Sequence, residues 1–509
     1  MKSLYSNPEL LRYARAQLRP GRLLTTAIIC FALSLTIGFA ALHGESRSAD
    51  ALGAAGLGLL HTAFLVQALV LAAGGGIACL HSIFGEKEQN TFDYQRITRL
   101  TPLELALGKL FGAPLLTYWI CLCLAPLTFY AAFVGHAHLP FVFAAYAVLL
   151  VASLAFHAFT LLISLFSVKG SQVTGTVLAL LLLWLGSVEI FGTAVCMHSL
   201  GPFIAADLAL ENSWEDPHTL IKLANGRELR EFAIPSRFED VFWGHPVHHF
   251  PILLGIDLSL ALWFLLAVVR NIKRDPQQYV AYSPWQFLAF VLYLNVILVS
   301  FYSAKWGTLY DSESFLLFVN LVIFFFLGVA LLRNRQRARA MLYASQSRSA
   351  FWSGRFWPAP VLVLGTLLAG MLIIVALNYR QVPEKHWNVG FAVLRALAFT
   401  VWMVSNMQLL QCLGLRPGKH PLVMGALYLS IYYVCAGGML GVVGCFREPR
   451  LMPFGSLFVP SAIFLLEPST WMEGPALWMA SFVVQAALIV LLFFVQTNVF
   501  RRIAIHAQT

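Results

Sequence analysis

The stretch EKEQNTFDYQRITRLTPLELALGKLFG, from Glu86 to Gly112, decides the interpretation of the whole chain. It is rich in charged side chains, although only 11% of the 509 residues are charged and 59% are hydrophobic. Apolar runs of about 20 residues or more, each long enough to cross a bilayer, lie on both sides of it. The pattern predicts a polar connection at one surface of a membrane, between two transmembrane helices.

Similar apolar runs recur along the chain and predict an all-α polytopic membrane protein. A soluble protein would carry about a quarter charged residues, and a membrane β-barrel would show alternating segments of about ten residues. About twelve transmembrane helices are expected, at 23–43, 56–84, 110–134, 139–166, 173–196, 251–270, 284–303, 313–332, 358–377, 388–411, 421–445 and 474–499.

The distribution of basic residues predicts the orientation of these spans. With the N-terminus in the cytoplasm, about two thirds of the 34 lysines and arginines fall in cytoplasmic segments, as the positive-inside rule requires. Both termini are therefore expected in the cytoplasm, in a plasma (inner) membrane. The net charge of +10 indicates contact with anionic lipids. No basic soluble domain is visible, so we expect no nucleic-acid partner.

The spacing of the loops predicts two six-helix halves, because the longest outer connection follows the fifth span in each. The expected segments are a cytoplasmic amphipathic leader (1–22), a first half (23–270) with a cytoplasmic loop (85–109) and an outer loop (198–250), a linker (271–283), and a second half (284–509) with a cytoplasmic loop (333–357) and an outer loop (446–473).

Local signals define the structure of the opening stretch. Thr101 and Glu104 have the spacing of a capping box, and Pro102 suits the first position of the helix that comes after them. This helix should run into the third span and kink near Pro114. Upstream, a short helix from about Phe92 to Arg99 is expected, capped by Asn90 or Thr91. The alternative is a solvated connection with well-formed caps and no partner.

The same stretch resembles the cytoplasmic signature of type 2 ABC exporter permeases, in which Glu-x-Glu-x-Gly-Thr precedes a Thr/Pro-rich turn, Glu-Leu and Gly-Lys. Asn90 stands where that family usually has glycine, and both residues tolerate the left-handed conformation. The matching residues are Glu86, Glu88, Thr91, Thr98, Thr101, Pro102, Glu104, Leu105, Gly108 and Lys109. The second cytoplasmic loop lacks the Glu-x-Glu pair.

The resemblance implies an exporter subunit that works with cytoplasmic ABC ATPase subunits, two in number if both halves bind one. ATP and Mg are then expected on the partner, with no cofactor and no catalytic residue on this chain; the sequence contains no phosphate-binding loop. By position, the docking region would comprise Glu86, Glu88, Thr91, Phe92, Arg96, Arg99, Thr101 and Glu104.

Ionisable residues within the spans are rare and costly, which makes three of them informative. Glu189, Asp257 and Arg395 all lie about 10 Å below the outer surface, at 1.5 Å per helical residue. They are candidates for the translocation path, and structural pairing is the alternative. Cys196 and Cys445, at outer ends of spans, are a candidate disulfide.

Other functions are also compatible with the sequence. A twelve-span secondary transporter, a permease-like subunit without transport activity and an outer-face membrane enzyme all fit the composition. No metal site is expected, although His245, His248 and His249 lie close together in the outer loop. Few charges within the spans favour an amphipathic or hydrophobic substrate.

Overall fold

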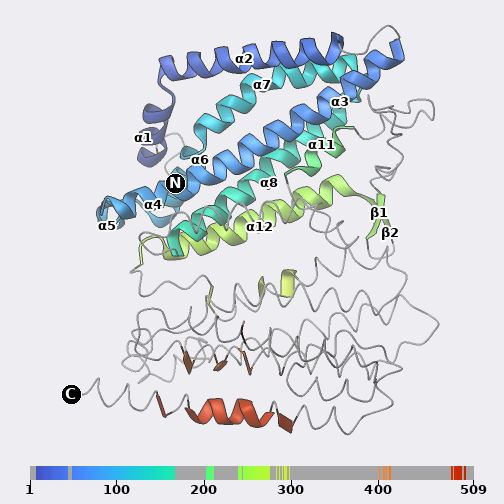
Figure 1. Ribbon diagram of the computed structural model, residues 1–509. Helices are drawn as coiled ribbons and strands as arrows, with labels where there is room; N and C mark the ends of the chain where they lie inside the picture. Colours follow the sequence, from blue (N-terminus) through green and yellow to red (C-terminus); the bar gives the residue numbers. More distant parts are fainter. Residues whose placement is uncertain are drawn as a thin grey trace, which may run out of the picture. The chain divides into compact units, whose positions relative to one another are not determined.

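The computed structural model describes residues 7–43, 49–166, 202–210, 239–242 and 245–274, and scattered residues between 282 and 499. The chain divides into two compact units, Met1–Tyr279 and Val280–Thr509. The predicted span 173–196 lies outside the described residues. The spans between 313 and 445 lie wholly or largely outside them, and the spans 284–303 and 474–499 are described in part. The first unit contains the continuously described helices (Figure 1).

The described part of this unit is helical apart from one short hairpin in the predicted outer loop, where β1 (Glu239–Phe242) pairs antiparallel with β2 (His245–His248). The helices are α1 (Pro8–Gln17), α2 (Pro20–His43), α3 (Ala49–Ala68), the π-helix η2 (Leu69–Gly74), α4 (Gly75–Glu88), α5 (Phe92–Ile97), α6 (Pro102–Gly112), α7 (Leu115–Val134), α8 (Leu139–Phe166), α11 (Ile204–Leu208) and α12 (His249–Asn271).

Five helical stretches are long and apolar enough to cross a membrane: Pro20–Ala40, Leu52–Glu88, Pro102–Val134, Leu139–Phe166 and Phe250–Asn271. They correspond to five of the first six predicted spans. Their outward side chains are apolar; Leu24, Ile28 and Phe31 on α2 are all more than half exposed. The prediction of a helical chain with membrane-capable apolar helices is therefore confirmed for this part of the chain.

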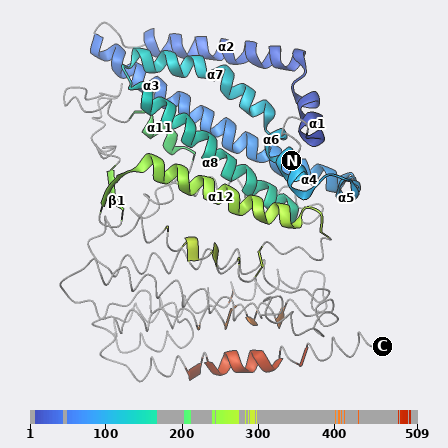
Figure 2. The same cartoon turned by 180° about the vertical axis from the view of Figure 1, so that it is seen from behind.

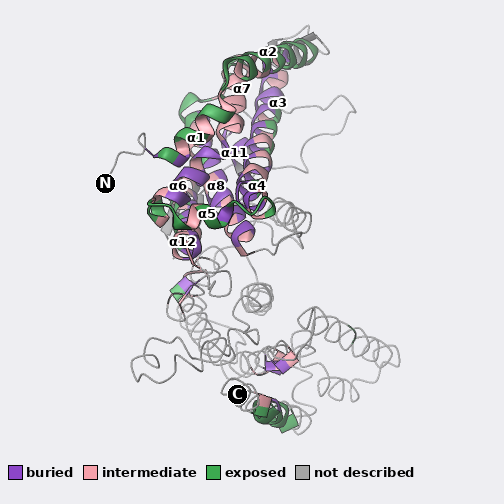
Figure 3. Cartoon of the chain, turned by 90° about the vertical axis from the view of Figure 1, so that its left-hand side faces the viewer, coloured by how far each residue is buried: buried purple, intermediate pink, exposed green. Residues whose placement is uncertain are grey.

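The core lies between α4, α6, α8 and α12, where buried residues concentrate (Figure 3). Two glycines let α4 approach α8 closely. A Cβ on Gly75 would overlap the ring of His157, and one on Gly76 would meet the ring of Phe156 at 2.5 Å. The GGG sequence at 74–76 therefore serves helix packing.

The π-helix η2 interrupts the second span beside these glycines. His157, fully buried on α8, has Nε2 2.8 Å from the carbonyl oxygen of Leu71 and Nδ1 3.3 Å from the hydroxyl of Tyr118. Because a carbonyl only accepts, Nε2 carries the hydrogen and Nδ1 accepts from Tyr118. The π-turn thus presents a backbone acceptor to a buried histidine.

The third span has the expected kink. Helix α6 ends at Gly112 and α7 begins at Leu115, so the interruption falls on Ala113 and Pro114. Proline cannot donate the backbone hydrogen bond that would continue the helix. The kink separates α6, which packs in the core, from α7, which packs on α2 and α3.

Candidate functional site

Four helical segments meet at one end of the first unit, named the polar end: α1, the last turn of α4, α5 and α6 (Figures 1 and 2). It contains the whole of the stretch Glu86–Gly112. Helix α1 runs across the end of α2 rather than along it (Figures 1 and 2). The polar end therefore brings together the leader and the first cytoplasmic loop, although the first two spans lie between them in the sequence.

The turn between α4 and α5 depends on Asn90. Its φ is +57°, in the left-handed region, and the amide of Thr91 donates to the carbonyl of Glu86 at 2.8 Å. The expectation that Asn90 would substitute for glycine here is confirmed. Thr91 is the N-cap residue of α5 but makes no side-chain capping hydrogen bond, and α5 ends at Ile97 rather than Arg99.

The capping box at the start of α6 is confirmed. The hydroxyl of Thr101 accepts from the amide of Glu104 at 3.2 Å, and the carboxylate of Glu104 accepts from the amide of Thr101 at 2.8 Å. Pro102 occupies the first helical position, as expected. The connection from α5 to α6 therefore has a fixed end at Thr101.

A buried ion-pair network centres on Glu86. Its Oε1 accepts from Nη2 of Arg12 at 2.7 Å and from Nε2 of Gln95 at 2.5 Å, and its Oε2 lies 2.6 Å from Nζ of Lys109. Glu9 completes the network, 2.7 Å from Arg12 and 3.2 Å from Lys109. One carboxylate at the end of α4 thus contacts α1, α5 and α6.

The network is electrically balanced, with two carboxylates and two cations, which offsets the cost of burying Lys109 completely. Burial lowers the pKa of Arg12, whereas its hydrogen bond to Glu86 and the negative charge of Glu9 raise it. Together the two carboxylates outweigh burial, so the pKa lies above its usual value and Arg12 is charged. For Tyr13 burial has the opposite effect: it raises the pKa of the phenol, which therefore stays neutral.

Further contacts fasten α1 to α6. Asn7 caps α1 by accepting from the amide of Glu9 at 3.0 Å, and its Nδ2 donates to the carbonyl of Glu104 at 2.7 Å. A Cβ on Gly108 would lie 2.6 Å from Cβ of Glu9, and one on Gly112 would lie 2.9 Å from the ring of Tyr13. Close packing of the two helices therefore requires both glycines.

Helix α5 is held from three sides. Phe92 is buried in the core, Gln95 donates to Glu86, and Nζ of Lys273, beyond α12, donates to the carbonyl of Thr98 at 2.7 Å. The opposite face is apolar but uncovered within the described chain: Tyr94 is 71% exposed and Ile97 82% exposed. A firmly anchored helix thus presents two large apolar side chains outward.

The eight residues expected to dock a partner fall into three groups by burial. Glu86 and Phe92 face inward and support the loop, and Arg96 and Glu104 are half-buried, bonded to Asp93 and Thr101 respectively. The exposed ones are Glu88, Thr91, Arg99 and Thr101. Glu86 and Phe92 therefore support the loop from inside in this conformation, and docking of a partner on this region stays a prediction.

Tyr94 and Ile97 were not among the eight predicted docking residues, although their angular positions on a helical wheel could have identified them. Residues three apart on an α-helix differ by about 60° in direction, and both lie more than about 100° from Phe92. Once Phe92 is assigned to the core, the other two must face away from it. The sequence alone does not decide which of the three aromatic and aliphatic residues is buried.

The intramembrane candidates are only partly described. Asp257 on α12 is buried, 1% exposed, and its Oδ2 has no hydrogen-bond partner among the described residues. Glu189 and Arg395 lie outside the described residues, as do Cys196 and Cys445. A charge cluster of the three ionisable residues stays a prediction.

These features define a helical membrane protein with a rigidly supported surface helix at one end. Comparison with family models, curated proteins and solved structures finds no match to this chain. A function for the protein therefore has to be inferred from its own residues.

Proposed function

We propose that this protein is the membrane-spanning subunit of an ATP-driven exporter of the ABC class, with cytoplasmic ATPase subunits docking on α5 and on its counterpart in the second half. In this proposal the chain has twelve spans in two six-helix halves in the plasma membrane, with both termini and the polar end in the cytoplasm. ATP and Mg²⁺ act on the partner, and the substrate is amphipathic or hydrophobic.

The uncovered apolar face of α5 is the observation that carries the proposal. Tyr94 and Ile97 are largely exposed, although α5 itself is anchored by Phe92, Gln95 and Thr98. A solvated loop needs neither anchors nor exposed apolar side chains. Apolar and aromatic residues on a rigid support are typical of protein-binding surfaces.

The support explains how docking would be coupled to the spans. Helix α5 is tied to α4 through Glu86 and is followed by α6, which begins at the fixed Thr101 cap. A displacement of α5 would therefore move the second and third spans, and, through Arg12, the leader helix α1. Such a linked set of short helices can transmit a conformational change of the partner.

A twelve-span secondary transporter is the second candidate, and Asp257 favours it. A buried intramembrane carboxylate with an oxygen unpaired among the described residues is the kind of group that carriers use to bind a proton or cation. The two candidates differ in what α5 contacts, because a secondary transporter has no ATPase to bind.

Co-purification tests the proposal. The full chain would be isolated from its own host in mild detergent, and bound proteins identified by mass spectrometry. We expect an ATPase subunit in fixed ratio with the wild type and with Leu11→Ser, which removes an exposed apolar residue from α1, but not with Tyr94→Ser/Ile97→Ser. A chain that transports substrate without ATP and without a bound ATPase would contradict the proposal.

A further inference from the structure

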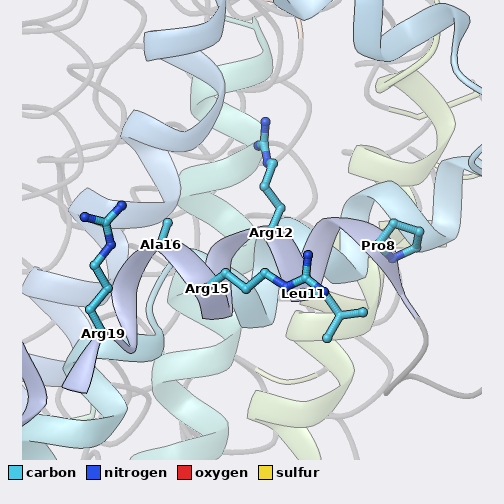
Figure 4. Close-up of a pocket in the computed structure, with 6 residues that line it drawn as sticks. All are labelled: Pro8, Leu11, Arg12, Arg15, Ala16 and Arg19. Carbon is cyan, nitrogen blue, oxygen red and sulfur yellow. The ribbon is translucent and has the colours of Figure 1, made fainter.

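The outward face of α1 carries a shallow basic groove that the proposed function does not use. The residues that line it recur at helical spacing on the side away from α6: Pro8, Leu11, Arg12, Arg15, Ala16 and Arg19. Figure 4 shows Arg12 and Arg19 extending on the same side of α1, with Arg15 beside Leu11. Three guanidinium groups thus surround a small apolar surface.

The positive charge of the groove is largely unneutralised by the described chain. The ion pairs there do not include Arg15 or Arg19, and both side chains are exposed. Arg12 contacts Glu9 and Glu86 through Nη2 alone, although a guanidinium has five N–H donors. The groove can therefore bind an anion without disrupting the network behind it.

The position of the groove indicates where that anion comes from. Arg19 directly precedes α2, whose exposed Leu24 and Ile28 face the hydrocarbon region of a membrane. Helix α1 runs across the end of α2 rather than along it (Figures 1 and 2). The groove consequently lies at the depth of lipid headgroups, with Leu11, 41% exposed, offering an apolar contact beside the arginines.

We propose that this groove binds the headgroup phosphate of an anionic phospholipid, through Arg15 and Arg19 with Arg12 contributing a third guanidinium. The planar guanidinium matches a phosphate with two parallel hydrogen bonds, and clustered basic residues at a membrane surface attract anionic lipids. A soluble phosphate compound would gain nothing from the apolar surface or from the neighbouring lipid-facing helix. The site does not depend on an ATPase partner.

Titration with labelled lipid tests the site on the full chain purified in neutral detergent. We expect saturable binding of fluorescent phosphatidylglycerol and weak binding of fluorescent phosphatidylcholine. Arg15→Gln/Arg19→Gln should weaken phosphatidylglycerol binding about 25-fold, since each basic residue near an anionic lipid contributes about fivefold. Arg99→Gln/Arg274→Gln removes the same charge outside the groove and should leave the affinity within about twofold of the wild type.

Two further measurements distinguish a lipid site from misfolding of the variant and from a site for soluble phosphates. Thermal unfolding should show that the groove variant is folded. Arg15→Lys/Arg19→Lys keeps the charge but loses the two parallel hydrogen bonds, so its affinity should lie between those of the wild type and the glutamine variant. Glycerol 3-phosphate at the lipid concentration should not displace the lipid. Equal loss in both double glutamine variants, unchanged binding in the groove variant, or displacement by glycerol 3-phosphate would each overturn the proposal.

Discussion

Helices α1 and α5 lie at the same end of the first unit and contact the same carboxylate, Glu86, yet they present opposite chemistry outward. Helix α1 buries its acid, Glu9, and exposes Arg15, and the exposed Arg19 lies two residues beyond its end. Helix α5 buries its anchor, Phe92, and exposes large apolar side chains. Two short surface helices thus share one support and offer different surfaces.

The difference indicates different partners. A row of arginines beside the first span suits the anionic surface of the membrane, whereas an apolar face on a helix directed away from the spans suits a protein. Glu86 is the support that both helices share, through Arg12 of α1 and Gln95 of α5. Variants of the shared support should therefore affect both helices, and variants of one surface should affect only its own partner.

The largest effect is expected from removing Lys109, the fully buried cation of the shared support. Lys109→Met leaves Glu9 and Glu86 with Arg12 alone, and breaking a buried pair in this way costs about 3–5 kcal/mol. The midpoint of thermal unfolding in detergent should fall markedly. Adding Glu86→Gln should recover part of the loss, because the two residues interact directly. Unchanged stability in Lys109→Met would disprove the network.

A smaller and more local effect is expected at the contact between α1 and α6. Gly108→Ala places a Cβ 2.6 Å from Cβ of Glu9, and overpacking of this kind typically costs about 1–3 kcal/mol. Helix α1 should open more often, and trypsin should cleave after Arg12 and Arg15 faster. Gly85→Ala, whose Cβ meets nothing within 4 Å, is the matched control and should behave as the wild type.

The two threonines that precede α5 and α6 should differ in how much their replacement by alanine destabilises the helix that follows. Thr101→Ala removes the hydroxyl that caps α6, and loss of such a cap costs about 1 kcal/mol. Thr91→Ala, before α5, removes no cap and should cost less. Hydrogen exchange at the first turn of α6 should increase in the first variant only; equal exchange in both would show that the capping box does not stabilise the loop.

The smallest effect on stability is expected from the outward face of α5. Tyr94→Ser/Ile97→Ser changes two exposed side chains, and each such surface substitution usually alters stability by less than about 0.5 kcal/mol. The unfolding midpoint should therefore match that of the wild type while partner binding is lost. A large loss of stability would instead assign these residues a structural role.

Local sequence signals predicted the polar end well where neighbours along the chain determine it. The Thr101–Glu104 box, the left-handed Asn90 and the interruption at Pro114 each depend on a few consecutive residues, and all three are confirmed. The expected amphipathic leader contains helix α1, Pro8–Gln17, on which Leu11 is 41% exposed.

Long-range contacts were beyond such reasoning. Glu86 meets Arg12 and Lys109 across 74 and 23 residues, and periodicity cannot show which charges will pair. In the π-helix at Leu69–Gly74, the carbonyl of Leu71 is hydrogen-bonded to His157, which lies 86 residues further along the chain. A hint was present in Lys109 itself, because a lysine among the apolar residues of α6 requires a buried counter-charge.

Site-specific photocrosslinking tests the central claim most directly. A photoreactive phenylalanine analogue at position 94, on α5, or at position 11, on α1, would be activated in membranes of the native host, and the crosslinked products identified by mass spectrometry. The account predicts that position 94 crosslinks to an ABC ATPase subunit and that position 11, which lines the basic groove, crosslinks to lipid. Crosslinks from position 94 to lipid alone, or to the same protein as position 11, would contradict it.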